Sequence, residues 1–553
     1  MGYDTTSADQ PGLSQCDGVV TVDERDASTA SWHIDGCRAD YGNSGGPVFI
    51  CADICGEELD PVVVGDIARI PADGTLRTSG PLTGLSAWLL YADAADLPFT
   101  ATYPGNNVGS SDPAHDELRG IPSASNTAPR PNERTAYYTS WSVYANQFYP
   151  KHLDTQGIAG KLTTLNYAFE NIDPINLTCM EANKAGSSND NDTTGNDGAG
   201  DAWADYQMGF TSDNSVDGST DTWDQPLKGN FNQLKQLKAK YPNLKVLVSL
   251  GGWTYSKYFS DVAATDTSRK KFVSSCIDMY IKGNLPVLDG SPAGGQGAAA
   301  GVFDGFDIDW EFPGSTNGHP GNHVSAADTA NYTLLLQEFR RELDALGGKH
   351  YTLTAAVPSG PGEIAKIQPG SLAGALDMAN VMTYDFYGAW NPTGPTNFNS
   401  QLTDSAANPD AGAGFSVEDA INAYISGGMP ADKLTVGIPL YARGWTGVSD
   451  GGTHGLYQSA TGPSPAYSLS QQPGVAFYKE LRADGKLNAF WMDPTTKSTW
   501  AYDGTNWWSV ETPQSISYKL QYVASAGLAG VMLYSLEGDD ANSTLVNAAL
   551  GDR

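Results

Sequence analysis

The sequence predicts an α/β protein whose larger part is a (β/α)8 TIM barrel, and the spacing of its apolar runs is the main evidence. From residue 133 onward, eight short runs are rich in β-branched and aromatic residues: 135–141, 162–169, 245–250, 302–310, 351–357, 378–385, 434–438 and 530–533. Helical stretches separate most of these runs, and two of them, 231–241 and 332–346, carry apolar residues three and four positions apart. Eight strands that alternate with helices over about 420 residues are typical of this barrel.

Other segments complete the predicted organisation. Residues 1–100 are rich in Val, Gly, Asp and Thr and predict an all-β partial barrel, and the Pro-, Ser- and Asn-rich segment 101–132 predicts a linker to the barrel at 133–553. Between the seventh and eighth strands, residues from about 444 to 508 are aromatic without helical period and predict a small α+β insertion. The Asn-, Asp- and Gly-rich stretch 186–224 is interpreted as a solvated loop, because it lacks the Gly and Glu positions of a calcium-binding loop.

The composition argues against several classes of partner. Lys plus Arg number 32 and Asp plus Glu number 63, which gives a net charge of −31. Neither nucleic acid nor a membrane surface is an expected partner, because both favour a basic protein face. No apolar run approaches the roughly 18 residues that a membrane-spanning helix needs. We expect a monomer with no metal or other cofactor.

The six cysteines indicate an oxidising compartment. Four lie in the first 55 residues, and Cys179 and Cys276 lie in the predicted barrel. An even number divided in this way suits disulfide bonds, although two buried free thiols remain an alternative for Cys179 and Cys276. An extracellular location is expected. The N-terminus shows no signal peptide, and a start of the gene product further upstream would explain its absence.

A row of carboxylates is the most informative local feature. Asp307, Asp309 and Glu311 occupy every second position of an apolar run, so on a strand they share one face. Like charges on a buried face raise the pKa of at least one carboxyl. Glu311, at the C-terminal end, is therefore expected to be a protonated acid, as cleavage of a glycosidic bond requires. Asp304 is out of phase and is expected to serve structure at the start of the strand.

Four motifs occur in the order that a known family shows. They are S-x-G-G at 249–252, D-x-x-D-x-D-x-E at 304–311, M-x-Y-D at 382–385 and Pro-Leu-Tyr-Ala-Arg at 439–443. Together they resemble those of family 18 glycoside hydrolases, in particular the bacterial chitinases that carry an inserted domain. The resemblance extends over residues 133–553 and implies hydrolysis of chitin or chitooligosaccharides.

The resemblance implies a retaining mechanism in which the substrate supplies its own nucleophile. Glu311 would protonate the glycosidic oxygen, and the 2-acetamido carbonyl of the substrate would attack C1. Asp309 would hydrogen-bond the acetamido N–H, Asp307 would share a proton with Asp309, and Tyr384 would hold the acetamido oxygen in line.

The resemblance also implies residues that bind the sugar at the −1 position. Asp385, Arg443, Tyr441 and Met382 belong to the motifs and are expected around that sugar. Tyr534 ends the eighth strand, where the family usually has Trp, so the aromatic floor of the site is expected to be smaller here.

Exposed aromatic side chains are expected along a sugar-binding cleft, because sugar rings present apolar C–H faces. Trp253 and Trp390 follow strand ends and are predicted on the aglycone side. Trp141 and Phe169 end the first two strands and are predicted to line the pocket floor. Ordinary core packing is the alternative for each, and it is the stronger interpretation for Phe169.

A second motif lies in the N-terminal segment. Gly-Asn-Ser-Gly-Gly-Pro at 42–47 resembles the nucleophile loop of chymotrypsin-like serine proteases, with Ser44 as the nucleophile. Only 43 residues precede Ser44, too few for the first barrel of that fold. We interpret residues 1–100 as the second half of such a domain, a remnant or a truncated copy, and keep protease activity as a minority hypothesis.

A chitinase is the leading hypothesis, and two alternatives use the same barrel. An endo-β-N-acetylglucosaminidase ranks lower, because such relatives generally lack the inserted domain. A chitin-binding lectin with little turnover is the non-enzyme alternative, but such proteins usually have lost the acid, and Glu311 is intact here.

Overall fold

The computed structural model describes residues 130–551, apart from 188, 190 and 191, and the backbone of seven short strands between residues 2 and 79. The chain divides into two compact units, Met1–Ser125 and Asn126–Arg553. Ser44 and most of the predicted linker lie outside the described residues, so the protease interpretation of the first unit and its vestigial nucleophile stays a prediction.

The described strands of the first unit pair only in antiparallel fashion, as expected of an all-β segment. Three small sheets contain them. The strands are β1 (Gly2–Asp4) with β2 (Gly12–Ser14), β3 (Val19–Asp23) with β4 (Ser31–Arg38) and β7 (Thr75–Ser79), and β5 (Pro47–Ile50) with β6 (Val62–Asp66).

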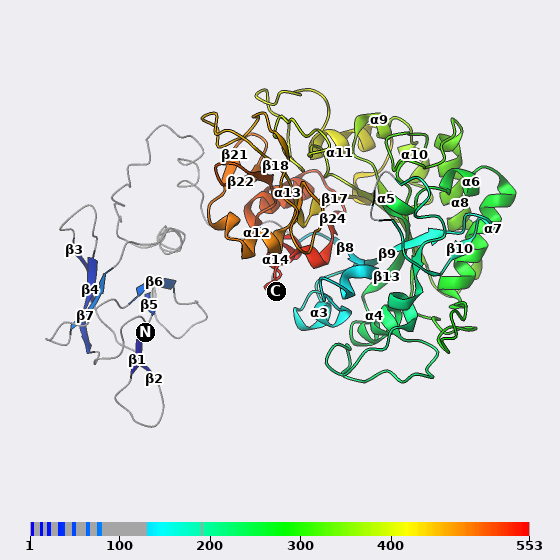
Figure 1. Cartoon of the computed structure of the whole chain (residues 1–553), viewed down its shortest axis with the longest axis horizontal. Helices are drawn as coiled ribbons and strands as arrows, with labels where there is room; N and C mark the ends of the chain where they lie inside the picture. Colours follow the sequence, from blue (N-terminus) through cyan, green and yellow to red (C-terminus); the bar gives the residue numbers. More distant parts are fainter. Residues whose placement is uncertain are drawn as a thin grey trace. The chain divides into compact units, whose positions relative to one another are not determined.

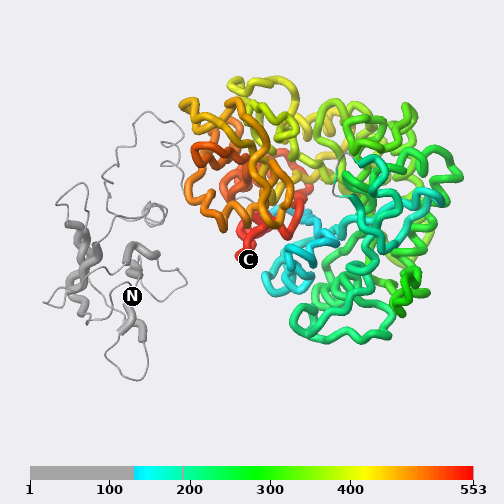
Figure 2. Tube along the Cα trace, in the orientation of Figure 1, coloured from blue at the N-terminus to red at the C-terminus, as the bar shows by residue number. Residues whose placement is uncertain are grey.

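Eight parallel strands of the second unit close into a barrel, which confirms the predicted fold class (Figure 1). In barrel order they are β8 (Glu133–Thr139), β9 (Thr164–Ile172), β13 (Lys245–Gly251), β14 (Gly305–Asp309), β15 (Thr352–Val357), β16 (Met378–Val381), β17 (Leu434–Pro439) and β24 (Gly530–Tyr534). The last strand pairs with the first, Gly530 opposite Glu133. Figure 2 shows these distant parts of the chain, coloured red and cyan, side by side.

Helices surround this barrel. They are α3 (Pro150–Thr155), α4 (Gly229–Lys240), α5 (Gly252–Tyr255), α6 (Phe259–Ala263), α7 (Asp266–Cys276), α8 (Asp328–Leu346), α9 (Pro361–Ile364), α10 (Pro369–Leu372), α11 (Val417–Ser426), α13 (Pro513–Ser525) and α14 (Thr544–Leu550). On α8 the buried residues Tyr332, Leu336 and Phe339 recur every three or four positions, so one stripe of the helix faces the barrel. Helix α13 begins at a capping box in which Thr512 accepts from the backbone N–H of Ser515.

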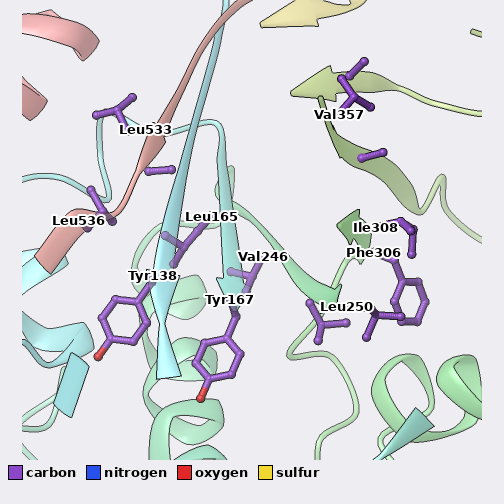
Figure 3. Close-up of a cluster of buried hydrophobic side chains, with 14 of the residues drawn as sticks. Tyr138, Leu165, Tyr167, Val246, Leu250, Phe306, Ile308, Val357, Leu533 and Leu536 are labelled. Atoms are coloured by element: carbon purple, nitrogen blue, oxygen red, sulfur yellow. The ribbon is translucent and has the colours of Figure 1, made fainter. Parts of the chain in front are cut away.

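Alternation along each strand separates two layers of side chains. Phe306 and Ile308 of β14 join the apolar layer between barrel and helices, together with Tyr138, Leu165 and other residues shown in Figure 3. Asp307 and Asp309, one position out of phase, point to the barrel interior. The strand therefore places its carboxylates inside while its apolar residues stabilise the outer layer.

The N-terminal end of β14 differs from the prediction. The strand begins at Gly305, although Val302 and Phe303 are buried, because an apolar run does not distinguish a strand from a buried turn. Asp304 pairs with Lys238 at 2.7 Å and with Lys349 at 2.7 Å, so it ties the strand's start to its neighbours.

A second sheet lies between β17 and β24, where the sequence predicts the α+β insertion. It is antiparallel and consists of β19 (Gly462–Pro463), β18 (Tyr441–Thr446), β23 (Trp507–Ser509), β22 (Ser498–Tyr502) and β21 (Trp491–Asp493), with β20 (Val475–Phe477) also paired to β18 and α12 (Tyr478–Ala483) following it. Phe398, Trp445, Trp500 and Trp507 form its buried cluster. The aromatic residues without helical period thus form the core of this sheet.

The stretch 186–224 corrects the prediction of a solvated loop. It contributes β12 (Gly200–Asp201), which pairs with β11 (Asn183–Lys184), and the π-helix η3 (Trp203–Gln207). Residues 204–207 of η3 are buried. Preceding it, β10 (Cys179–Met180) pairs with β9, and a disulfide joins Cys179 to Cys276 at the end of α7, which settles the choice between disulfide and free thiols.

Candidate active site

Asp307 lies at the centre of the barrel and accepts hydrogen bonds from side chains of four other strands. Oδ2 accepts from Tyr137 at 2.6 Å and Ser249 at 2.7 Å, and Oδ1 accepts from Thr354 at 2.6 Å and Asn380 at 3.4 Å. Burial raises the pKa of Asp307, and these donors act in the opposite direction. Asp307 is therefore a rigid anchor for the strand that carries the other two carboxyls.

Asp309 is the next inward residue and has a different environment. Its side chain is buried, and its Oδ1 has no hydrogen-bond partner within the described barrel. Burial, followed by the negative charges of Glu311 and Asp307, raises the pKa of Asp309 well above its usual range. Both oxygens of Asp307 accept hydrogen bonds from other side chains. The proton sharing predicted between Asp307 and Asp309 therefore stays a prediction.

Glu311 follows the end of β14 and is held through its backbone. Its N–H donates to Ser256 Oγ at 2.9 Å, and Asn322 Nδ2 donates to its carbonyl at 2.7 Å. Burial, and then the charge of Asp385, raises the pKa of Glu311 to about 8. The raised pKa favours the protonated form of the Glu311 carboxyl at neutral pH, and the two hydrogen bonds hold its main chain.

The M-x-Y-D and Tyr-Ala-Arg motifs meet at Asp385. Its Oδ1 accepts from Tyr441 Oη at 2.8 Å and from Arg443 Nε at 2.7 Å, and its N–H donates to Asn399 Oδ1 at 2.8 Å. The backbone of Asp385 has a φ of +58°, a left-handed conformation that turns the chain after β16. Residues from three separate segments thereby form one charged group beside Glu311.

An aromatic cluster forms the floor of the site. Tyr384 and Tyr441 are buried in it, and Met382, Phe169 and Tyr534 pack against it. The Tyr534 ring lies with its centroid 6.2 Å from that of Tyr384 and 6.4 Å from those of Phe169 and Tyr441. The hydroxyl of Tyr384 contacts only the weak acceptor Met532 Sδ, at 3.7 Å, among the hydrogen bonds of the described residues.

The predicted cleft tryptophans are all exposed. Trp141, Trp253 and Trp390 expose 42%, 39% and 59% of their surface, which excludes core packing for the three. Trp390 lies under the Arg443 guanidinium at 5.2 Å, and Trp141 lies 6.2 Å from Phe169 between ring centroids. Phe169, by contrast, is partly buried, so it contributes both to packing and to the pocket.

A groove of about 790 Å³ extends from Phe169 and Trp141 along the segment that follows β10. Its lining includes Tyr144, Trp203 and Tyr255, which the sequence analysis did not single out. Trp203 lies in the stretch that was interpreted as a solvated loop, and its aromatic type was the available signal. The groove lengthens the site on the side of β8 and β9.

The closed parallel barrel, with polar side chains gathered at the carboxyl ends of its strands, defines a TIM-barrel protein with its site at the usual face. Residues 133–539 match the model of Glycosyl hydrolases family 18. The chain therefore belongs to that family.

Individual relatives agree with this membership. The chain is 38% identical over 413 residues to chitinase C of Streptomyces lividans, a match that covers 74% of this chain and 58% of that protein. It is 35% identical over 443 residues to chitinase A1 of Niallia circulans, with 75% and 58% covered. The solved catalytic domain of psychrophilic chitinase B from Arthrobacter TAD20 is 45% identical with a TM-score of 0.71, and the match covers 76% of this chain and 94% of that one. The chain spans about three fifths of the length of the two curated relatives.

No described helix is long and apolar enough to cross a membrane.

Proposed function

We propose that this protein hydrolyses β-1,4-N-acetylglucosaminide bonds in chitin and chitooligosaccharides, with Glu311 as general acid and base. The observation that carries the proposal is the change in hydrogen bonding and in pKa along the carboxylate row. Asp307 is fully hydrogen-bonded, Asp309 is buried with a free oxygen, and Glu311 has a pKa of about 8 at the end of the strand. A carboxyl that keeps its proton at neutral pH is suited to protonate a leaving oxygen.

The neighbours of Glu311 support a substrate-assisted step. Asp309 Oδ1 has no protein donor and is placed to accept a hydrogen bond from the acetamido N–H of the substrate. The Tyr384 hydroxyl, with only Met532 Sδ as partner, is available to donate to the acetamido oxygen. These contacts would align that oxygen with C1 and stabilise the positive charge that develops on the ring formed by attack.

The remaining site residues are proposed to bind sugar. Asp385, Tyr441 and Arg443 form a pre-organised polar group for the −1 sugar, and Met382 and Tyr534 contribute to its apolar floor. Trp253 and Trp390 offer exposed faces on the aglycone side. The groove at Trp141 and Phe169 would accept further sugars of the chain.

The test is release of 4-methylumbelliferone from the di- and tri-N-acetylchitooligosaccharide conjugates. Wild type should release the fluorophore, and Glu311→Gln should lose at least about a thousandfold of kcat, because the amide cannot donate the proton that the Glu311 carboxyl is proposed to supply. Glu418→Gln, an exposed residue of α11, is the matched control and should retain full activity. Full activity of Glu311→Gln would refute the assignment of the acid.

The lectin alternative is distinguished by binding. If folded wild type retains chitin on a pull-down but releases no fluorophore, the protein binds without turnover. The replacement of the family's Trp by Tyr534 is the feature that favours this alternative. An endo-β-N-acetylglucosaminidase would instead release N-glycans from a glycoprotein. We also propose an extracellular location, which the Cys179–Cys276 disulfide supports.

A further inference from the structure

Three buried carboxylates meet beside β9, apart from the row on β14. Glu170 belongs to β9, Glu181 follows β10, and Asp205 belongs to η3. One oxygen of each lies within 4.8 Å of the other two. Their side chains expose only 3%, 7% and 1% of their surface. Three segments that are distant in sequence thus bring acidic groups to one point inside the protein.

Three oxygens of this carboxylate trio, all on the two glutamates, lack hydrogen-bond partners among the described residues. Both carboxylate oxygens of Glu181 and Oε1 of Glu170 are buried without a hydrogen bond in the described part of the chain. Burial raises the pKa of each of the three carboxyls, and the negative charge of Asp201 raises all three further. Buried carboxylates are normally paired, hydrogen-bonded or bound to metal, so the unpartnered Glu181 needs a ligand.

The donor set selects the kind of ligand. Carboxylate oxygens suit a hard cation, whereas a single proton shared between two of the three unpaired oxygens would leave the third without a partner. Oxygens on opposite sides of a calcium ion lie about 4.6–5.2 Å apart, whereas around magnesium they lie about 4.0–4.2 Å apart. The trio's oxygens lie within 4.8 Å of one another, which accommodates calcium, and magnesium usually keeps several waters instead of binding to protein carboxylates alone, so calcium is the better fit.

We propose that Glu170, Glu181 and Asp205 bind a calcium ion. The Tyr167 hydroxyl donates to Asp205 Oδ1 and itself accepts from Asn230 Nδ2 at 3.1 Å, so one oxygen of Asp205 is already oriented by the barrel. The other oxygen of Asp205 and those of both glutamates are left for the ion. This site departs from the expectation of a protein without metal.

The position of the trio indicates what the ion does. Glu181 lies two residues after Cys179, which the disulfide ties to α7, and Asp205 lies two residues after Trp203, which lines the groove. The ion would join both segments to β9 and hold the groove wall against the barrel. The disulfide would then hold the start of the stretch 179–205, and the ion would join its start to its end.

Two measurements on the whole chain test this site: terbium luminescence and the melting temperature. Both are made after EDTA has removed any bound metal from the protein. Terbium bound at the trio should show tyrosine-sensitised emission, because Tyr167 is in direct contact with Asp205, and excess calcium should quench it. Calcium should also raise the melting temperature by several degrees in a concentration-dependent way, and magnesium at the same concentration should raise it less.

Two variants separate the trio from other acidic sites. Glu181→Gln should lose the calcium-dependent rise in melting temperature and at least tenfold of terbium affinity. Asp192→Asn, at a partly exposed acidic residue outside the trio, should keep both responses. If Glu181→Gln does not fold, Glu170→Gln takes its place. The terbium titration of wild type then still shows whether the protein binds the ion. Wild type without a calcium response, or a Glu181→Gln variant with an unchanged one, would overturn the site. Neither readout depends on hydrolysis, so the failure of the proposed activity would leave this test intact.

Discussion

Nε of Arg443 lies 2.7 Å from Oδ1 of Asp385, and this ion pair sits beside the group proposed as the acid. The charge of Asp385 is the second cause, after burial, of the raised pKa of Glu311. Arg443 offsets that charge, so the two residues act on the pKa of Glu311 in opposite directions. The pair is therefore a means of tuning the acid as well as of binding sugar.

Substitutions in this pair should shift the pH profile in opposite directions. In wild type, kcat/KM should fall on the basic side as Glu311 loses its proton near pH 8. Asp385→Asn removes a negative neighbour, lowers the pKa of Glu311 and should move that basic limb to lower pH. Arg443→Gln exposes Glu311 to the full charge of Asp385 and should move the limb to higher pH.

The measurement is kcat/KM of the two variants from about pH 5 to pH 10, each compared with wild type. Both variants should lose activity at every pH, because both residues are proposed to contact the sugar. Only the direction of the basic limb tests the electrostatic argument, and a shift in the same direction in both variants would contradict it.

A conservative change at Thr354 should destabilise the fold through Asp307. Thr354→Val keeps the shape of the side chain but removes the donor that lies 2.6 Å from Asp307 Oδ1. Loss of one hydrogen bond to a buried carboxylate should cost about 1–3 kcal/mol of unfolding free energy in urea. Thr352→Val, on the same face of β15 and without a side-chain bond within the described barrel, should cost less. Equal losses would show that the Asp307 bond contributes little.

The fold was predictable because each barrel strand is a short run of buried apolar residues. The ends of the strands were not predictable. Val302 and Phe303 are buried although they precede the hydrogen-bonded part of β14, so burial does not mark where the strand begins. The stretch around Asp205 was misjudged for the converse reason. Its composition is polar, and only tertiary packing on β9 and the neighbouring helices buries it.

The candidate site also has parts that could be predicted from the sequence and parts that could not. Residues in contiguous motifs, such as Glu311 and Tyr384, could be found from the sequence. The hydrogen bonds to Asp307 could not, because Ser249 was noted only as part of a motif and Thr354 is an ordinary strand residue. They converge only through the register of the closed barrel, in which Ser249 and Thr354 lie directly beside Asp307 on its two neighbouring strands.

The Tyr534 ring should be essential to the site while its hydroxyl is not. The ring lies with its centroid 5.5 Å from that of Tyr137 and close to Tyr384 and Phe169, so it packs the floor of the site, where we propose that it faces the sugar. Tyr534→Phe should keep activity within about threefold. Tyr534→Ala should lower kcat/KM at least tenfold, which corresponds to about 1.4 kcal/mol of transition-state stabilisation. Melting curves of both variants check that the fold survives, and equal activity of the two would contradict a sugar platform at this position.

Glu311 should make the folded protein less stable as the pH rises. Its folded pKa of about 8 lies above its ordinary value of 4.5, so folded Glu311 holds a proton between these pH values while the unfolded chain has lost it. The contribution to stability is complete below about pH 4.5 and is lost as the pH rises through 8. Glu311→Gln removes this dependence. Its melting temperature should match that of wild type near pH 4 and exceed it at pH 8, and the comparison cancels the buried carboxyls that lie away from Glu311, which titrate alike in both proteins. A difference that stays constant between pH 4 and pH 8 would mean that Glu311 titrates alike in the folded and unfolded states, and would remove the basis for its role as a neutral acid.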